Sequence, residues 1–270
     1  MIVKNKVILV TGAGGGIGTE LCLTLLQRGV KVAALDMRND GLEKLTELAG
    51  ENAKYLTTHV LDITDKAAVE KLPEKIITEH GSIDGIINNA GIIQPFVRVN
   101  DLSYEASEKV MNVNFYGTLY MTKTFLPLLL KRPSAHIVNI SSMGGFLPVP
   151  GQSVYGASKA AVKLFTEGLY AELADTNVRV TVVFPGATKT NIAENSGANI
   201  IKQPEDSSHS QSFPMLSANE AAKIIIDGME KDKFQIFTGK DSNFMNLLCR
   251  LNPHFATNFI TKKMKSLLPK

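Results

Sequence analysis

The 270-residue chain is predicted to fold as a doubly wound α/β sheet, in which parallel strands carry helices on both faces. Short runs of residues are apolar at consecutive positions and rich in Val and Ile, which is typical of strands buried on both faces. Stretches with helical spacing separate these runs, and parallel strands require such crossover connections. Alternation of the two patterns along the chain therefore predicts a single parallel sheet.

Seven strands are predicted, in chain order, at residues 7–10, 30–35, 54–60, 85–87, 136–140, 178–183 and 234–237. Helices are predicted between them at residues 16–28, 42–49, 66–79, 103–130, 154–173 and 218–230. The last helix follows a capping box formed by Ser217 and Glu220. Residues 194–213 are rich in Ser, Asn and Gln and are expected to be weakly structured. We expect residues 1–240 to form one catalytic domain and residues 241–270 a helical extension.

The composition is that of a globular enzyme, with 44% hydrophobic and 20% charged residues. A net charge of +3 predicts no nucleic-acid partner for the domain as a whole. Two distant cysteines form neither a disulfide framework nor a metal cluster, and the sequence enters a strand without an apolar leader, so we expect a cytoplasmic protein. The five histidines are scattered, so we expect surface or capping positions for them and no metal site.

A glycine-rich loop connects the first strand to the first helix. Its pattern is Gly12-x-x-x-Gly16-x-Gly18, and Ile17 stands where the common Gly-x-Gly-x-x-Gly fingerprint has its third glycine. Glycine lets the backbone approach a pyrophosphate, and the helix N-terminus supplies free N–H groups. Asp36 ends the second strand, where a carboxylate can bind both ribose hydroxyls and repel a 2′-phosphate. These features favour NAD, although Arg38 leaves NADP open.

Tyr155 and Lys159 are four residues apart on one face of a predicted helix, and Ser142 precedes the tyrosine by thirteen positions. A nearby cation lowers the pKa of a phenol from its usual value near ~10. A phenol tuned in this way, beside a serine hydroxyl, can protonate a carbonyl oxygen as a hydride reaches its carbon. Alone, this spacing also fits a tyrosine packed over a lysine stem.

Taken together, residues 4–240 resemble the short-chain dehydrogenase/reductase family, which has a single-domain Rossmann-like fold. The resemblance rests on Thr11 to Gly18, on Asn88-Asn89-Ala90-Gly91, and on the Ser142, Tyr155 and Lys159 positions. It implies the catalytic set Asn114, Ser142, Tyr155 and Lys159. It implies cofactor contacts from Gly12, Gly14, Gly15, Gly16, Ile17, Gly18, Asp36, Met37, Asp62, Ile63, Asn89, Ala90, Gly91, Tyr155, Lys159, Pro185, Gly186, Thr188 and Thr190. It also implies homodimers or homotetramers, formed through the helices that carry Asn114 and Tyr155.

The predicted reaction is hydride transfer between a nicotinamide cofactor and a ketone or secondary alcohol. The expected substrate pocket consists of Ile93, Phe96, Met143, Phe146, Val149 and Gln152. These side chains include no Arg or Lys to bind a carboxylate or phosphate, so we expect an apolar substrate body, such as a lipid, steroid-like or xenobiotic carbonyl. The alternative is a regulatory or scaffold protein of the same fold that binds the dinucleotide without turnover.

The C-terminal 30 residues carry five basic residues and one acid. We expect them to fold over the pocket mouth or against a neighbouring subunit. An amphipathic helix lying on an anionic membrane is the less favoured alternative.

Overall fold

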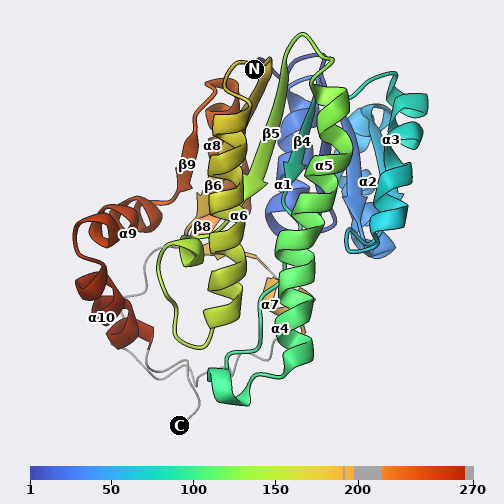
Figure 1. Ribbon diagram of the computed structural model, residues 1–270. Coiled ribbons are helices and arrows are strands. Elements are labelled where there is room, and N and C mark those ends of the chain that lie inside the picture. Colours follow the sequence, from blue (N-terminus) through green and yellow to red (C-terminus); the bar gives the residue numbers. More distant parts are fainter. Residues whose placement is uncertain (191, 198–214, 265–270) are drawn as a thin grey trace.

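The computed structural model describes residues 1–190, 192–197 and 215–264. Its centre is a parallel sheet of seven strands in the order β3-β2-β1-β4-β5-β6-β9 (Figure 1). The strands are β1 (Val7–Thr11), β2 (Lys31–Asp36), β3 (Leu56–Val60), β4 (Gly85–Asn88), β5 (Ala135–Ile140), β6 (Val178–Pro185) and β9 (Gln235–Thr238). This confirms the doubly wound parallel fold.

Helices cover both faces of the sheet. One face packs against α1 (Gly16–Gln27), α2 (Asn39–Ala49) and α8 (Ala218–Glu230). The other packs against α3 (Lys66–His80), α5 (Thr118–Leu129) and α6 (Ser153–Glu172). Both faces of the sheet are therefore removed from water, which explains why its strands read as continuous apolar runs.

The predicted helix over 103–130 is not continuous. It consists of α4 (Tyr104–Met111), a π-helical segment (Asn112–Gly117, η3) and α5. A π-helical segment widens one turn, and such segments often occur at functional sites. The predicted third strand also starts later, because a 3₁₀ helix occupies Gly50–Tyr55.

The C-terminal segment forms two helices, α9 (Lys240–Leu251) and α10 (Pro253–Met264), which extend from the end of β9 (Figure 1). Their inner side chains, including Met245 and Ile260, pack with Leu147 in a separate small core. Leu147 follows the short 3₁₀ helix Met143–Gly145 (η4), so the helices cover the segment after Ser142. Most of the predicted weak segment, 194–213, lies outside the described residues. In the described part of the chain no helix is both long and apolar enough to cross a bilayer.

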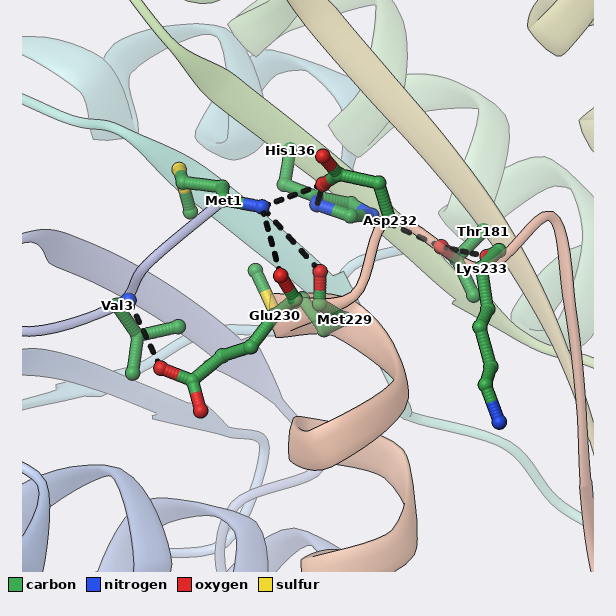
Figure 2. A network of polar contacts seen from close by, with 8 residues as sticks. All are labelled: Met1, Val3, His136, Thr181, Met229, Glu230, Asp232 and Lys233. Carbon is green, nitrogen blue, oxygen red and sulfur yellow. Dashed lines mark hydrogen bonds and ion pairs between the residues drawn. The ribbon is translucent and has the colours of Figure 1, made fainter.

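A polar network ties the first residues to the turn between α8 and β9, near the amino ends of β5 and β6 (Figure 2). The Met1 ammonium pairs with Asp232 and lies 3.4 Å from the Met229 carbonyl oxygen. His136 lies 2.8 Å from the Thr181 hydroxyl, which donates to the Lys233 carbonyl. The hydroxyl must therefore accept from His136 Nε2–H. Burial lowers the pKa of His136 to about 3, so this ring is neutral.

The expectation of surface or capping histidines is wrong for two of them. His136 is fully buried and His59 is 5% exposed. In each, the ring Nε2 is hydrogen-bonded to a threonine hydroxyl, His136 to Thr181 and His59 to Thr57. The pairing of His136 with Thr181 joins two strands, β5 and β6, that are far apart in the sequence, so scattered positions do not reveal it.

Candidate active site

The candidate site is a cavity of about 760 Å³ at the carboxyl ends of the strands. In doubly wound sheets, ligands bind at this edge. The cavity extends from Asp36 and Asp62 at one end to Ser142 and Tyr155 at the other. The structure thus brings together residues from strands and loops that lie far apart in the sequence.

The glycine loop packs against the segment that follows β4. A Cβ on Gly18 would lie 1.9 Å from the Gly12 carbonyl oxygen, and one on Gly12 would lie 2.8 Å from the Ala90 Cα. Gly12 also has φ +66°, a conformation that L side chains rarely adopt. The Asn89 side chain donates to the carbonyls of Thr11 and Gly12 and holds the loop in place. The N-cap residue of α1 is Gly15, which has no side chain to cap the helix, and this suits the approach of an anion to its N-terminus.

Two carboxylates, Asp36 and Asp62, lie in the same part of the cavity as the glycine loop. Asp36 accepts hydrogen bonds from the backbone N–H groups of Gly14, at 2.9 Å, and Arg38, at 3.0 Å. Asp62 accepts from the backbone and hydroxyl of Thr64. These bonds fix both carboxylates at the ends of neighbouring strands, where they can accept hydrogen bonds from a ribose and an adenine.

Most of the predicted cofactor residues line this one cavity. They are Gly12, Gly15, Gly16, Ile17, Asp36, Met37, Asp62, Ile63, Asn89, Ala90, Gly91, Tyr155, Lys159, Pro185, Gly186, Thr188 and Thr190. Gly14 and Gly18 are not among the lining residues and support the loop from behind. A glycine cradle, an uncapped helix start and a terminal carboxylate fit a dinucleotide, so these residues are the ones that would hold it.

Tyr155 lies in the first turn of α6, and Lys159 follows one turn later on the same face. The Tyr155 ring and the Ser142 hydroxyl lie side by side next to Gly144, whose N–H donates to Ser142 Oγ at 3.0 Å. The Lys159 ammonium is buried and donates to the Ile140 carbonyl at 2.9 Å. The three predicted side chains therefore meet at one end of the cavity.

Burial raises the pKa of Tyr155, and the hydrogen bond from Ser142 only partly opposes this shift. The expected lowering by Lys159 is thus not the net effect in this arrangement. Burial also lowers the pKa of Lys159 to about 8. Tyr155 is consequently a neutral phenol at pH 7, which is the form that can donate a proton to a carbonyl oxygen.

Asn114 lies in the π-helical segment and is fully buried. Its side chain accepts from the Ile92 N–H and donates to the Ile92 carbonyl and the Ser158 hydroxyl. It therefore connects the segment after Gly91 to α6. Asn114 does not line the cavity, so a direct catalytic role for it stays a prediction.

The six predicted substrate-pocket residues are not among the residues that line this cavity in the described structure. Phe146 packs against Phe184 and Phe237, and Gln152 is buried beside Gln94. Sequence reasoning missed other lining residues, from α4 and from the short helix α7 (Ile192–Asn195) with its next residue. They are Glu105, Glu108, Lys109, Ile192, Asn195 and Ser196. No local sequence pattern marks these positions, because they reach the cavity only through the packing of α4 and α7 beside the carboxyl ends of the strands.

Comparison with known proteins decides the family. Residues 6–200 match the family model for short chain dehydrogenases. The chain belongs to this family. SadH of Mycobacterium tuberculosis is 34% identical to it over 254 residues, which are 92% of this chain and 91% of that protein. The short-chain dehydrogenase is therefore a nicotinamide-dependent oxidoreductase, and the non-catalytic alternative is disfavoured.

Two solved structures resemble this dehydrogenase closely. A short chain dehydrogenase from Burkholderia cenocepacia, in complex with NADP, is 26% identical with a TM-score of 0.79 and covers 96% of this chain and 99% of its own. NAD⁺-bound xylitol dehydrogenase is 26% identical with a TM-score of 0.78 and covers 88% of this chain and 98% of its own. Both forms of the cofactor thus occur among its structural relatives.

The pKa of Lys159 predicts how reduction depends on pH. Below pH 8 the ammonium is charged, and as the pH rises through about 8 it loses this charge. We expect the kcat for carbonyl reduction to fall across this range. In Lys159→Arg the guanidinium stays charged, so the fall should move to higher pH even though the absolute rate is lower. Rates measured from pH 6 to 10 in both proteins check this, and the same midpoint in both would contradict it.

Proposed function

We propose that this short-chain dehydrogenase transfers a hydride between NAD and a ketone or secondary alcohol on an apolar body. The observation that carries the proposal is the meeting of Ser142, Tyr155 and Lys159 at one end of a cavity whose other end is built for a dinucleotide. The bound nicotinamide supplies the hydride. Residues 1–240 would form the catalytic domain, and residues 241–270 an extension that covers it.

In the proposed reduction, the Tyr155 hydroxyl gives its proton to the carbonyl oxygen, and the Ser142 hydroxyl donates a hydrogen bond to the same oxygen. Lys159 holds the nicotinamide ribose through its buried ammonium. Asn114 holds α6 against the segment after Gly91 through its hydrogen bonds to Ile92 and Ser158. It is also proposed to anchor the water chain that resupplies the proton to Tyr155. Pro185, Gly186 and Thr190 hold the carboxamide side of the ring. Oxidation of the alcohol follows the same path in reverse.

The preference for NAD rests on Asp36. Its carboxylate is fixed by two backbone N–H groups and would lie beside the adenosine ribose, where it repels a 2′-phosphate. Glu105 and Glu108 are further carboxylates among the residues that line the cavity. Arg38, whose side chain also lines the cavity, is the residue that could favour NADP instead.

The proposed apolar substrate rests on the residues around Tyr155. Ile92 and Ile192 line the cavity together with it. The six predicted pocket residues, from Ile93 to Gln152, remain proposals for the outer part of the site. The protein is proposed to be a cytoplasmic homodimer or homotetramer, which light scattering would test.

The deciding experiment titrates the purified protein with NADH and with NADPH and then follows absorbance decay with a panel of carbonyl compounds. We expect tighter binding of NADH and turnover of bulky apolar ketones. Tighter binding of NADPH would show that Arg38 outweighs Asp36. Clear preference for a charged keto acid over an apolar ketone would contradict the proposed substrate class.

A further inference from the structure

Gln94 is a fully buried glutamine in the segment after β4, and its side chain contacts the start of α6, the helix that carries Tyr155. Its Oε1 accepts hydrogen bonds from the backbone N–H groups of Val154 and Tyr155, both at 2.9 Å. Its Nε2 donates to the Gly151 carbonyl at 2.9 Å. One end of the side-chain amide therefore holds the first turn of α6, and the other end holds Gly151, just before the helix.

Helix α6 needs this contact because its own N-cap position supplies none. Gln152 precedes the helix, and its side chain makes no capping hydrogen bond. The first N–H groups of a helix have no partner within the helix, and burying them unpaired is costly. A residue 61 positions away along the chain satisfies the N–H of Tyr155.

A second hydrogen bond ties the same two segments together. The Gln152 Nε2 donates to the backbone carbonyl of Gln94 at 2.8 Å. The segment that carries Gln94 is itself anchored, because Asn114 binds Ile92 and the Ser196 hydroxyl accepts from the Ile93 N–H at 3.0 Å. Because this segment is anchored, the hydrogen bond from the Tyr155 N–H to Gln94 fixes the position of the Tyr155 backbone relative to it.

We propose that Gln94 is a positioning residue that sets the place of the Tyr155 hydroxyl by capping α6, an inference that rests on the proposed function of Tyr155 as the proton donor. Gln94 does not line the cavity, so it acts on the reaction through Tyr155 and not by touching the substrate. Small displacements of a reacting group lower rates strongly, and a misplacement of 1 Å can cost about 100-fold. The cap is therefore expected to affect kcat more than cofactor binding.

Two variants separate this role from simple packing. Gln94→Met keeps the length and volume of the side chain but removes the acceptor and the donor. We expect kcat to fall by about 10- to 100-fold at every pH, with the Kd of NADH changed by less than about twofold. Gln94→Glu can still accept both N–H groups, and in its protonated form it can also donate to Gly151. Its kcat should approach that of the wild type at low pH and fall once the new carboxyl group ionises beside Tyr155.

Gln235→Met is the matched control. Gln235 is a half-buried glutamine on β9 whose side chain donates to Glu167 at 3.0 Å. The substitution removes a similar hydrogen bond to α6, but at Glu167, twelve residues after Tyr155, so it should leave kcat and its pH profile unchanged. Equal loss of kcat in Gln94→Met and Gln235→Met would overturn the proposal, as would a kcat for Gln94→Met that matches the wild type.

Hydrogen exchange gives a readout that needs no turnover. Amide exchange in a peptide that spans residues 152–156 should be faster in Gln94→Met than in the wild type and unchanged in Gln235→Met. Unchanged exchange in Gln94→Met would overturn the capping role even if the enzyme were active. If the wild type bound NADH but reduced no carbonyl compound, the proposed function would fail, and the exchange measurement would still decide whether Gln94 holds the backbone of Tyr155.

Discussion

Replacing Tyr155 with Phe is expected to lower the kcat for carbonyl reduction by roughly 10²- to 10⁴-fold, the range typical for removal of a general acid. The substitution removes only the phenolic hydroxyl of Tyr155. The ring stays, so α6 and the cavity wall should keep their positions. The Kd of NADH, measured by fluorescence titration, should therefore stay close to that of the wild type.

The control for this prediction is Tyr104→Phe. Tyr104 is 89% exposed at the start of α4, and loss of its hydroxyl should not change the rate. If Tyr155→Phe kept more than about a tenth of the wild-type kcat, the proton would have to come from another group or from water. That result would remove Tyr155 from its proposed role while leaving the family assignment intact.

Gly18→Ala is expected to impair both cofactor binding and stability. The new Cβ would lie 1.9 Å from the Gly12 carbonyl oxygen, and backbone atoms cannot move aside as a flexible side chain can. Strain of this kind typically lowers the free energy of unfolding by about 1–3 kcal/mol. The displaced loop should also raise the Kd of NADH by about tenfold or more, which corresponds to ~1.4 kcal/mol of binding free energy.

Gly168→Ala adds the same methyl group where no atom lies within 4 Å of it. Gly168 is in the interior of α6, where alanine is favoured over glycine by up to about 1 kcal/mol, so this variant should be as stable as the wild type or more stable. Thermal melts and NADH titrations of both variants make the comparison. Equal stability and equal affinity in Gly18→Ala and Gly168→Ala would contradict the close packing of the glycine loop.

Local patterns in the sequence account for the framework and for the family. The apolar runs predict the strands because those strands are buried on both faces, and helical spacing predicts the crossovers. The glycine loop, Asp36 and the Tyr155–Lys159 pair could be recognised because each is defined by residues close together in the sequence. The pair is one helical turn apart, and the loop and Asp36 each lie at the end of a strand. Tyr155 and Lys159 lie on one face of α6, and Ser142 follows the end of β5, the strand that precedes this helix in the chain. The three residues are therefore close in the sequence as well as in the fold.

Contacts between distant segments could not be predicted in the same way. The net pKa shift of Tyr155 depends on how deeply the phenol is buried, and that depth is a property of the packed molecule. The π-helical turn at Asn114 and the capping of α6 by Gln94 each join segments that the sequence separates by 20 residues or more. The buried His136 is hydrogen-bonded across the sheet to Thr181, whose hydroxyl in turn donates to the Lys233 carbonyl.

The sequence by itself therefore determined the doubly wound fold, the dinucleotide loop and the chemical groups available for proton transfer, because propensity, periodicity and short spacing encode these features locally. Only the tertiary structure decided how those groups are buried, which side chain accepts a hydrogen bond from the backbone N–H of Tyr155, and which residues of α4 and α7 complete the cavity. These properties arise from chain crossings and from exclusion of water, which no single stretch of sequence specifies.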